Sequence, residues 1–111
     1  MGTIIVRQKR APCTMDLRGH LILIIESEVT TFVRLLQQAI DETGAESLVV
    51  SDPYGVGGLE RMKRFKFSAA LINIQHSSVI NRLDVPVIVY GDNATPARPD
   101  VIVQKLAKLS L

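Results

Sequence analysis

A chain of 111 residues is long enough for one domain and too short for two, and its 47% hydrophobic content is enough to fill a core. Thirteen Lys and Arg against eleven Asp and Glu leave a net charge of +2, too near balance to indicate a nucleic-acid partner. The single cysteine, Cys13, excludes a scaffold held by intrachain disulfides and fits a reducing cytoplasm. The longest apolar run, residues 21–25, is far below the roughly 20 residues that cross a bilayer, so we expect a cytoplasmic protein with no membrane span.

The first half of the chain predicts an N-terminal extension, a strand and a helix. Residues 1–16 hold a short apolar group at 3–7, which is a candidate strand, and otherwise show little periodicity. The apolar run at 21–25 is typical of a strand buried on both faces of a parallel sheet. Apolar residues then recur every three or four positions, which predicts a helix from about 28 to 43, ended by Gly44.

The second half predicts three more strands, at 48–50, 69–74 and 85–90, with a periodic helical segment between the first two. Only 12 residues separate the third strand from the proline that opens the fourth, so a helix there has room for one or two turns. Asp100 is a plausible N-cap for an amphipathic terminal helix, although residues 101–103 also fit a short strand.

Strands that alternate with helices predict an α/β fold with a parallel sheet and right-handed crossovers. Ligands of such sheets bind beyond the carboxyl ends of the strands, so the residues that follow each apolar run are the candidate site. These residues are Glu26, Ser27, Glu28, Ser51, Asp52, Asn73, Gln75, Tyr90, Gly91 and Asp92.

Several motifs resemble the receiver domain of bacterial two-component response regulators. The resemblance is carried by LRGHLILIIESE with the helical pattern up to Gly44, by AALINI and by DVPVIVYG, and it covers the domain at residues 17–111. It implies a flavodoxin-like, doubly wound parallel sheet with strand order 2-1-3-4. Only eight residues separate Gly91 from Asp100, so the fifth strand of a typical receiver is expected to be shortened or missing.

Receivers accept a phosphoryl group on an Asp at the end of the third strand, and an acidic pair after the first strand holds Mg²⁺. The resemblance places Glu26 at the first acidic position, Ser27 at the second and Asn73 at the phosphoacceptor position. An amide is neither an anionic nucleophile nor able to form an acyl phosphate. The resemblance therefore implies a degenerate site without metal, cofactor or catalysis.

Two further receiver positions also depart from the pattern. The small hydroxyl expected after the fourth strand falls on Gly91 or Tyr90, and Arg98 before Pro99 stands where a lysine is expected. We therefore expect a non-phosphorylatable pseudo-receiver, not an enzyme, that acts by protein–protein interaction in bacterial signal transduction. Its expected partners are a second copy of the chain, as a homodimer, and a histidine kinase or phosphotransfer protein.

Two other functional hypotheses stay open. One is a small-ligand or nucleotide sensor that uses the strand ends and the glycine loop at 55–58, which lacks the Lys-Ser/Thr of a Walker motif. The other is an authentic phosphoacceptor at Asp52 or Asp92.

The remaining polar residues have simpler interpretations. Ser27 is expected to cap the first long helix, with Glu28 in its first turn, and Asn73 to act as a hydrogen-bonding peg for neighbouring loops. His20 and His76 lack partners at metal-ligand spacing. The basic residues that we interpret as a solvated helix face rather than a nucleic-acid site are Arg61, Lys63, Arg64 and Lys66.

The fourth strand is expected to lie at an edge of the sheet. Its side chains should alternate, with Val87 and Val89 on one face and Ile88 and Tyr90 on the other. Its free backbone groups could pair with residues 3–6 or with another copy of the chain. We expect a dimer interface there, extended by the 75–85 connection and the terminal helix, on which Leu109 should point outward.

Overall fold

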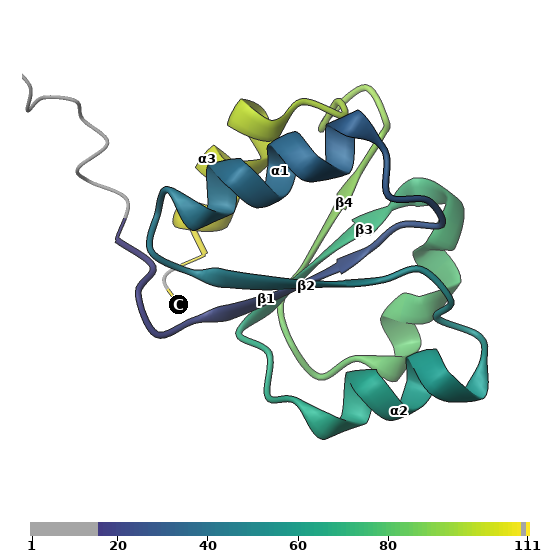
Figure 1. Cartoon of the computed structure of the whole chain (residues 1–111). Helices are drawn as coiled ribbons and strands as arrows, with labels where there is room; N and C mark the ends of the chain where they lie inside the picture. The colour runs from purple at the N-terminus through teal and green to yellow at the C-terminus, as the bar shows by residue number, and fades with distance from the viewer. Residues whose placement is uncertain (1–15, 110) are drawn as a thin grey trace, which may run out of the picture.

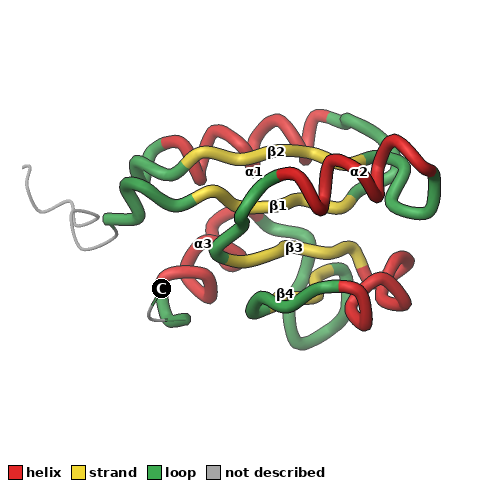
Figure 2. The backbone as a smooth tube through the Cα atoms, turned by 90° about the horizontal axis from the view of Figure 1, so that it is seen from below, coloured by secondary structure: helices red, strands yellow, loops and turns green. Residues whose placement is uncertain are grey.

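The computed structural model describes residues 16–109 and 111, and it forms one four-stranded, all-parallel sheet with helices on both faces (Figure 1). The strand order is β2-β1-β3-β4, which confirms the predicted α/β class and order (Figure 2). The candidate strand at 3–7 lies outside the described residues. The elements are β1 Leu21–Ile25, α1 Thr31–Asp41, β2 Glu46–Val50, α2 Val56–Arg64, β3 Ala69–Asn73, the 3₁₀ helix η3 Ile74–Arg82, β4 Val87–Tyr90 and α3 Pro99–Ala107.

Both faces of the central strands are buried, as the continuous apolar runs predict. Ile22 and Ile24 of β1 belong to a core under α1 and α3, whereas Leu23 and Ile25 belong to a second core under α2 and η3. Figure 1 shows α1 and α3 together on one face of the sheet and α2 on the other. The alternation expected of β4 is confirmed, since Tyr90 faces the first core and Val87 the second.

Helix α1 begins later than the sequence pattern predicted. Its N-cap is Thr30, whose hydroxyl accepts a hydrogen bond from the Val33 amide at 3.4 Å, so the prediction of Ser27 as N-cap is wrong. Glu28 also precedes the helix, whose first turn holds no acidic residue. The buried stripe of α1 starts at Val33. Thr30 lies three residues before Val33, which is the spacing at which an N-cap side chain reaches a backbone amide of the first turn. Gly44 follows the helix with φ +90°, a left-handed conformation that favours glycine.

Helix α3, in contrast to α1, begins earlier than predicted. Its N-cap is Arg98, and Asp100, the predicted N-cap, lies in its first turn. Pro99 occupies the first turn, where its fixed φ suits a helix and its missing N–H costs nothing. The alternative of a strand at 101–103 is wrong, because these residues are helical. Leu109 was expected to point outward, but it packs against the core under α1 and α3.

The connection between β3 and β4, Ile74–Arg82, consists of two short 3₁₀ helices that meet at a kink at His76, where the sequence predicted a single helix of one or two turns. The rise of a 3₁₀ helix, about 2.0 Å per residue, lets so short a crossover span the sheet. Within the described residues, β4 is followed by a loop and α3 with no fifth strand between them. Strand β4 is therefore an edge of the sheet that the described residues form.

Candidate functional site

Three side chains from the ends of three neighbouring strands meet at the carboxyl edge of the sheet. Glu26 follows β1, Asn73 ends β3 and Tyr90 ends β4. The Asn73 amide nitrogen donates to Glu26 Oε2 at 3.0 Å, and the Tyr90 hydroxyl donates to the same oxygen at 2.7 Å. These three are residues that the receiver resemblance selected, and we call them the carboxylate cluster.

The carboxylate cluster is closed off from solvent at its acidic end. Glu26 is 9% exposed and Tyr90 is fully buried, with the Phe32 ring centred 5.4 Å from the Tyr90 ring. The second Glu26 oxygen, Oε1, accepts from the Ser27 amide at 3.3 Å. A buried carboxylate is tolerated when hydrogen-bond donors surround it, and here the chain itself supplies those donors.

Burial raises the pKa of the Tyr90 hydroxyl well above its ordinary value, and the neighbouring Glu26 carboxylate raises this pKa further. A negative charge on Tyr90 would have to form without water and beside another carboxylate. Tyr90 is therefore a permanent hydrogen-bond donor at neutral pH, not a base or nucleophile.

Asn73 connects two parts of the fold. Its amide nitrogen bonds Glu26, and its carbonyl oxygen Oδ1 accepts from the Gln75 amide at 2.9 Å, which caps η3. Both ends of the side chain are thus engaged within the protein, which is the peg role expected from the sequence. An Asp could not make the bond to Glu26, because a carboxylate has no N–H to donate.

Gly91 lies beside the carboxylate cluster and turns the chain away from it. Its φ is +101°, and a Cβ there would lie 3.9 Å from Asn73 Oδ1. The Gly91 amide donates to the Thr95 carbonyl at 2.8 Å, and the Thr95 amide donates to an Asp92 carboxylate oxygen at 2.7 Å. Asp92, a candidate phosphoacceptor, thus closes the loop after β4.

Two predicted site residues make no side-chain bond to the carboxylate cluster. Ser27 is exposed and contributes its backbone amide alone. Arg98 forms an ion pair with Asp100 at 2.8 Å, at the exposed start of α3. The described structure therefore brings together Glu26, Asn73 and Tyr90, with Gly91 adjacent, and engages Arg98 elsewhere.

The glycine loop at 55–58 packs closely around Asp52. The Gly55 amide donates to Asp52 Oδ1 at 3.0 Å, so a carboxylate already occupies the place near the start of α2 where a phosphate would bind. A Cβ on Gly58 would overlap the Asp52 carbonyl, whereas one on Gly57 would meet nothing within 4 Å. The glycines at 55 and 58 have a packing reason that requires no ligand.

A second polar group, which the sequence analysis missed, joins the start of α2 to η3. The Tyr54 hydroxyl lies 2.8 Å from Ser78 Oγ, and the Arg82 guanidinium lies 5.8 Å from the Tyr54 ring centre. The His76 ring is centred 6.1 Å from Tyr54, and neither of its nitrogens has a hydrogen-bond partner among the described residues. No spacing signal could have found this group, because its members come from separate elements.

Other candidate residues are structural or solvent-exposed. His20 Nδ1 bonds Ser68 Oγ at 2.7 Å, and the basic side chains of α2 are exposed, with Arg61 bonded to the Val49 carbonyl at 3.3 Å. Residues 16–109 and 111 contain no group of three or more His, Cys, Asp or Glu that could hold a metal ion. Nor do they form a helix of the length and apolar character that crossing a bilayer requires.

Comparisons with protein-family models, with curated proteins and with solved structures find no match to this chain. The observed order β2-β1-β3-β4 is consistent with a flavodoxin-like fold. Such a fold hosts many unrelated functions, so function has to be inferred from the site itself.

Proposed function

We propose that this protein is a protein–protein interaction module, a receiver-like domain of bacterial signal transduction that carries out no phosphoryl transfer. The observation that supports this proposal is the carboxylate cluster, in which the Glu26 carboxylate accepts bonds from Asn73, Tyr90 and the Ser27 amide. A reaction centre offers free polar groups to a substrate, whereas these groups are bonded to one another.

The chemistry of the cluster also disfavours a phosphoryl acceptor. The carboxamide of Asn73 has no anionic oxygen with which to attack phosphorus. One buried carboxylate, Glu26, is also a poor site for Mg²⁺, which prefers several oxygen ligands in octahedral geometry and retains part of its water shell. The cluster instead fixes the ends of β1, β3 and β4 relative to one another.

The open edge of β4 is the surface we assign to a partner, and a second copy of the chain fits it. The Ala70 amide donates to the Pro86 carbonyl at 2.9 Å, so in a parallel ladder Ile88 and Tyr90 also bond to β3. The backbone groups of Val87 and Val89 then face away from the sheet. Edge strands of this kind pair readily with another strand, and antiparallel pairing of two β4 strands would form a symmetric dimer.

Incubation with acetyl phosphate and Mg²⁺, followed by intact-mass measurement, tests the absence of phosphoryl chemistry. We expect the parent protein to gain no phosphoryl group, because Asn73 supplies no nucleophile. A stable adduct of one phosphoryl group would refute the proposal, and peptide mapping to Asp52 or Asp92 would establish the phosphoacceptor alternative.

A matched variant shows that the assay can detect a restored site. Ser27→Asp combined with Asn73→Asp adds two carboxylates beside Glu26, and we expect saturable Mg²⁺-dependent shifts of the Glu26 amide signal in this variant alone. Equal shifts in the parent would contradict the reading of Ser27 and Asn73 as departures from a metal site.

A further inference from the structure

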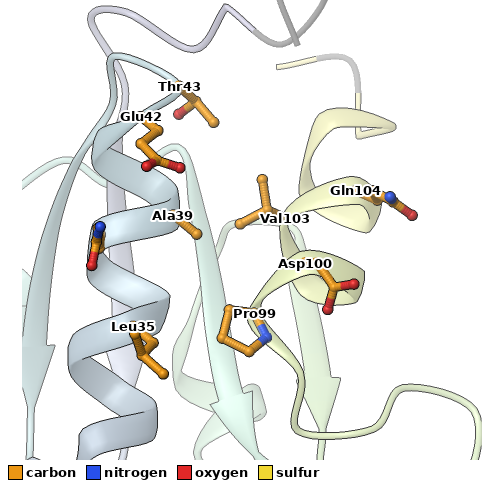
Figure 3. A pocket seen from close by; sticks show the side chains of 9 residues that line it. Leu35, Ala39, Glu42, Thr43, Pro99, Asp100, Val103 and Gln104 are labelled. Atoms are coloured by element: carbon orange, nitrogen blue, oxygen red, sulfur yellow. The ribbon is translucent and has the colours of Figure 1, made fainter. Parts of the chain in front are cut away.

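A groove runs between α1 and α3 on the face of the sheet opposite α2. Leu35 and Ala39 of α1 face Pro99 and Val103 of α3 across it (Figure 3). Leu35 is 50% exposed although it is large and apolar. The polar residues along the rim are Gln38, Glu42, Thr43, Asp100 and Gln104.

The end of this groove at the C-terminus of α1 carries the negative charge of Glu42, while the neighbouring Asp41 lies outside the groove. Helix α1 ends with Asp41 followed by its C-cap Glu42, and its last turn holds no basic residue. The C-terminus of a helix is the negative end of its dipole, where cations stabilise and carboxylates do not. The ion pairs within residues 16–109 join Arg18 to Asp16 and Arg98 to Asp100, so neither carboxylate of the α1 end has a cation bonded to it.

The chain enters the described structure at this acidic end. The Leu17 amide donates to the carbonyl of Thr43, a rim residue, at 2.8 Å. Residues 1–15 lie outside the described part, and they join the described chain next to Asp16, close to the end of the groove that Glu42 and Thr43 line.

Beyond a spacer of five uncharged residues, 11–15, the order of residue types in the tethered segment matches their order along the groove. Counted back from Asp16, the segment has first five uncharged residues, 11–15, then the basic residues Arg10, Lys9 and Arg7, and then the apolar residues 4–6. The groove, followed from Thr43, has first Glu42 and then its apolar walls at Ala39 and Leu35.

We infer that residues 3–10 of this chain dock in the α1–α3 groove, with the basic residues at the acidic end of α1 and residues 3–6 against Leu35 and Pro99. The reach is sufficient, since ten extended residues span about 33 Å. The distance along α1 from Thr43 back to Leu35 is only about 12 Å. A segment tethered beside its site is present at a high effective concentration, which favours it over the same segment of a second copy.

Paramagnetic broadening in the full chain tests this inference. The single cysteine allows a clean label position, with Cys13→Ser and Thr3→Cys carrying a nitroxide. We expect the amide signals of Leu35 and Val103 to lose intensity several-fold, and those of Gly57 and Met62 on the opposite face to keep theirs. Unchanged Leu35 and Val103 signals would overturn the inference.

Matched variants separate docking from the mere presence of a tether. Ile4→Ser with Ile5→Ser keeps the tether and the charges, and we expect it to restore the Leu35 and Val103 signals. Leu35→Lys should also abolish the broadening at Val103, whereas Val56→Lys, which changes a residue 78% exposed outside the groove, should preserve it. Broadening that persists in both groove and segment variants would overturn the inference.

A mixed sample identifies the source of the segment. Isotope-labelled protein without a nitroxide is combined with unlabelled protein that carries it. We expect no broadening in the mixture, because the segment docks within its own chain. Broadening of Leu35 in the mixture would show that a second copy supplies the segment and would overturn docking within one chain.

Discussion

Tyr90 supports the carboxyl edge of the sheet through one hydroxyl group. Tyr90→Phe removes the 2.7 Å donor to Glu26 and leaves a buried carboxylate oxygen with Asn73 as its remaining partner. We expect the free energy of unfolding to fall by about 2 kcal/mol, because bonds to charged groups are the stronger ones. Urea denaturation measures this loss. Tyr54→Phe is the control, since its hydroxyl is exposed and should cost less than 1 kcal/mol; equal losses would contradict the assigned role.

The raised pKa of Tyr90 also predicts a pH dependence. The unfolded chain ionises its tyrosines near pH 10, whereas burial first and Glu26 second keep the folded Tyr90 hydroxyl protonated well above that pH. The stability that depends on this proton is complete below about pH 10 and decreases as the pH rises further. Relative to Tyr90→Phe, the parent should lose about 1.4 kcal/mol of unfolding free energy per pH unit above 10. Reversible formation of a Tyr90 tyrosinate in the folded protein near pH 10, detected by ultraviolet absorbance, would contradict this account.

Individual site residues were predictable where a strand end fixed their position and not where a loop did. Glu26, Asn73 and Tyr90 end buried runs, so their meeting at one edge follows from parallel strands. The partners of Arg98 and Asp52 did not follow, because each bonds a neighbour two or three residues along the chain whose geometry depends on the local turn. In the sequence, Tyr90 or Gly91 stood where the resemblance expects a small hydroxyl side chain, and only the structure shows that the Tyr90 hydroxyl reaches Glu26.

At the scale of an element, helix α2 depends on one glycine and not on its neighbour. Gly57→Ala adds a methyl group into open space on a helix, and we expect it to raise stability by about 0.5–1 kcal/mol. Gly58→Ala adds the same group against the Asp52 carbonyl, which forces α2 away from its place and should cost about 1–3 kcal/mol. Thermal unfolding of the two variants side by side measures this contrast, and equal effects would show that the close approach at Gly58 is unimportant.

The existence of the described helices and strands could be predicted from apolar runs, helical periodicity and, for η3, connection length, but several boundaries could not. The stripe of Val33, Leu36 and Ile40 predicted α1, whereas its start depended on a choice between the capping residues Ser27 and Thr30. For η3, the short connection predicted a compact helix, but a 3₁₀ geometry has no hydrophobic period that distinguishes it from α in so short a segment.

At the scale of the whole molecule, the alternation of strands and helices was enough to predict a parallel sheet. The receiver resemblance predicted the strand order β2-β1-β3-β4. The contact between Tyr54 and η3 and the groove between α1 and α3 could not be predicted, because each depends on how separate helices pack on the finished sheet. What the sheet leaves open is the backbone of β4, and the proposed function depends on what covers it.

Sedimentation velocity of the parent and of Val89→Pro tests most directly whether this protein acts through its β4 edge. Proline lacks the outward amide that a second β4 strand would bond, yet an edge position facing away from the sheet tolerates it. Ser47→Pro is the control, since the Glu46 amide bonds the His20 carbonyl and Ser47 therefore faces out from the opposite edge strand, β2. We predict a dimer for the parent and for Ser47→Pro and a folded monomer, verified by circular dichroism, for Val89→Pro. A parent that sediments as a monomer at micromolar concentration, or a Val89→Pro variant that stays dimeric, would contradict the account.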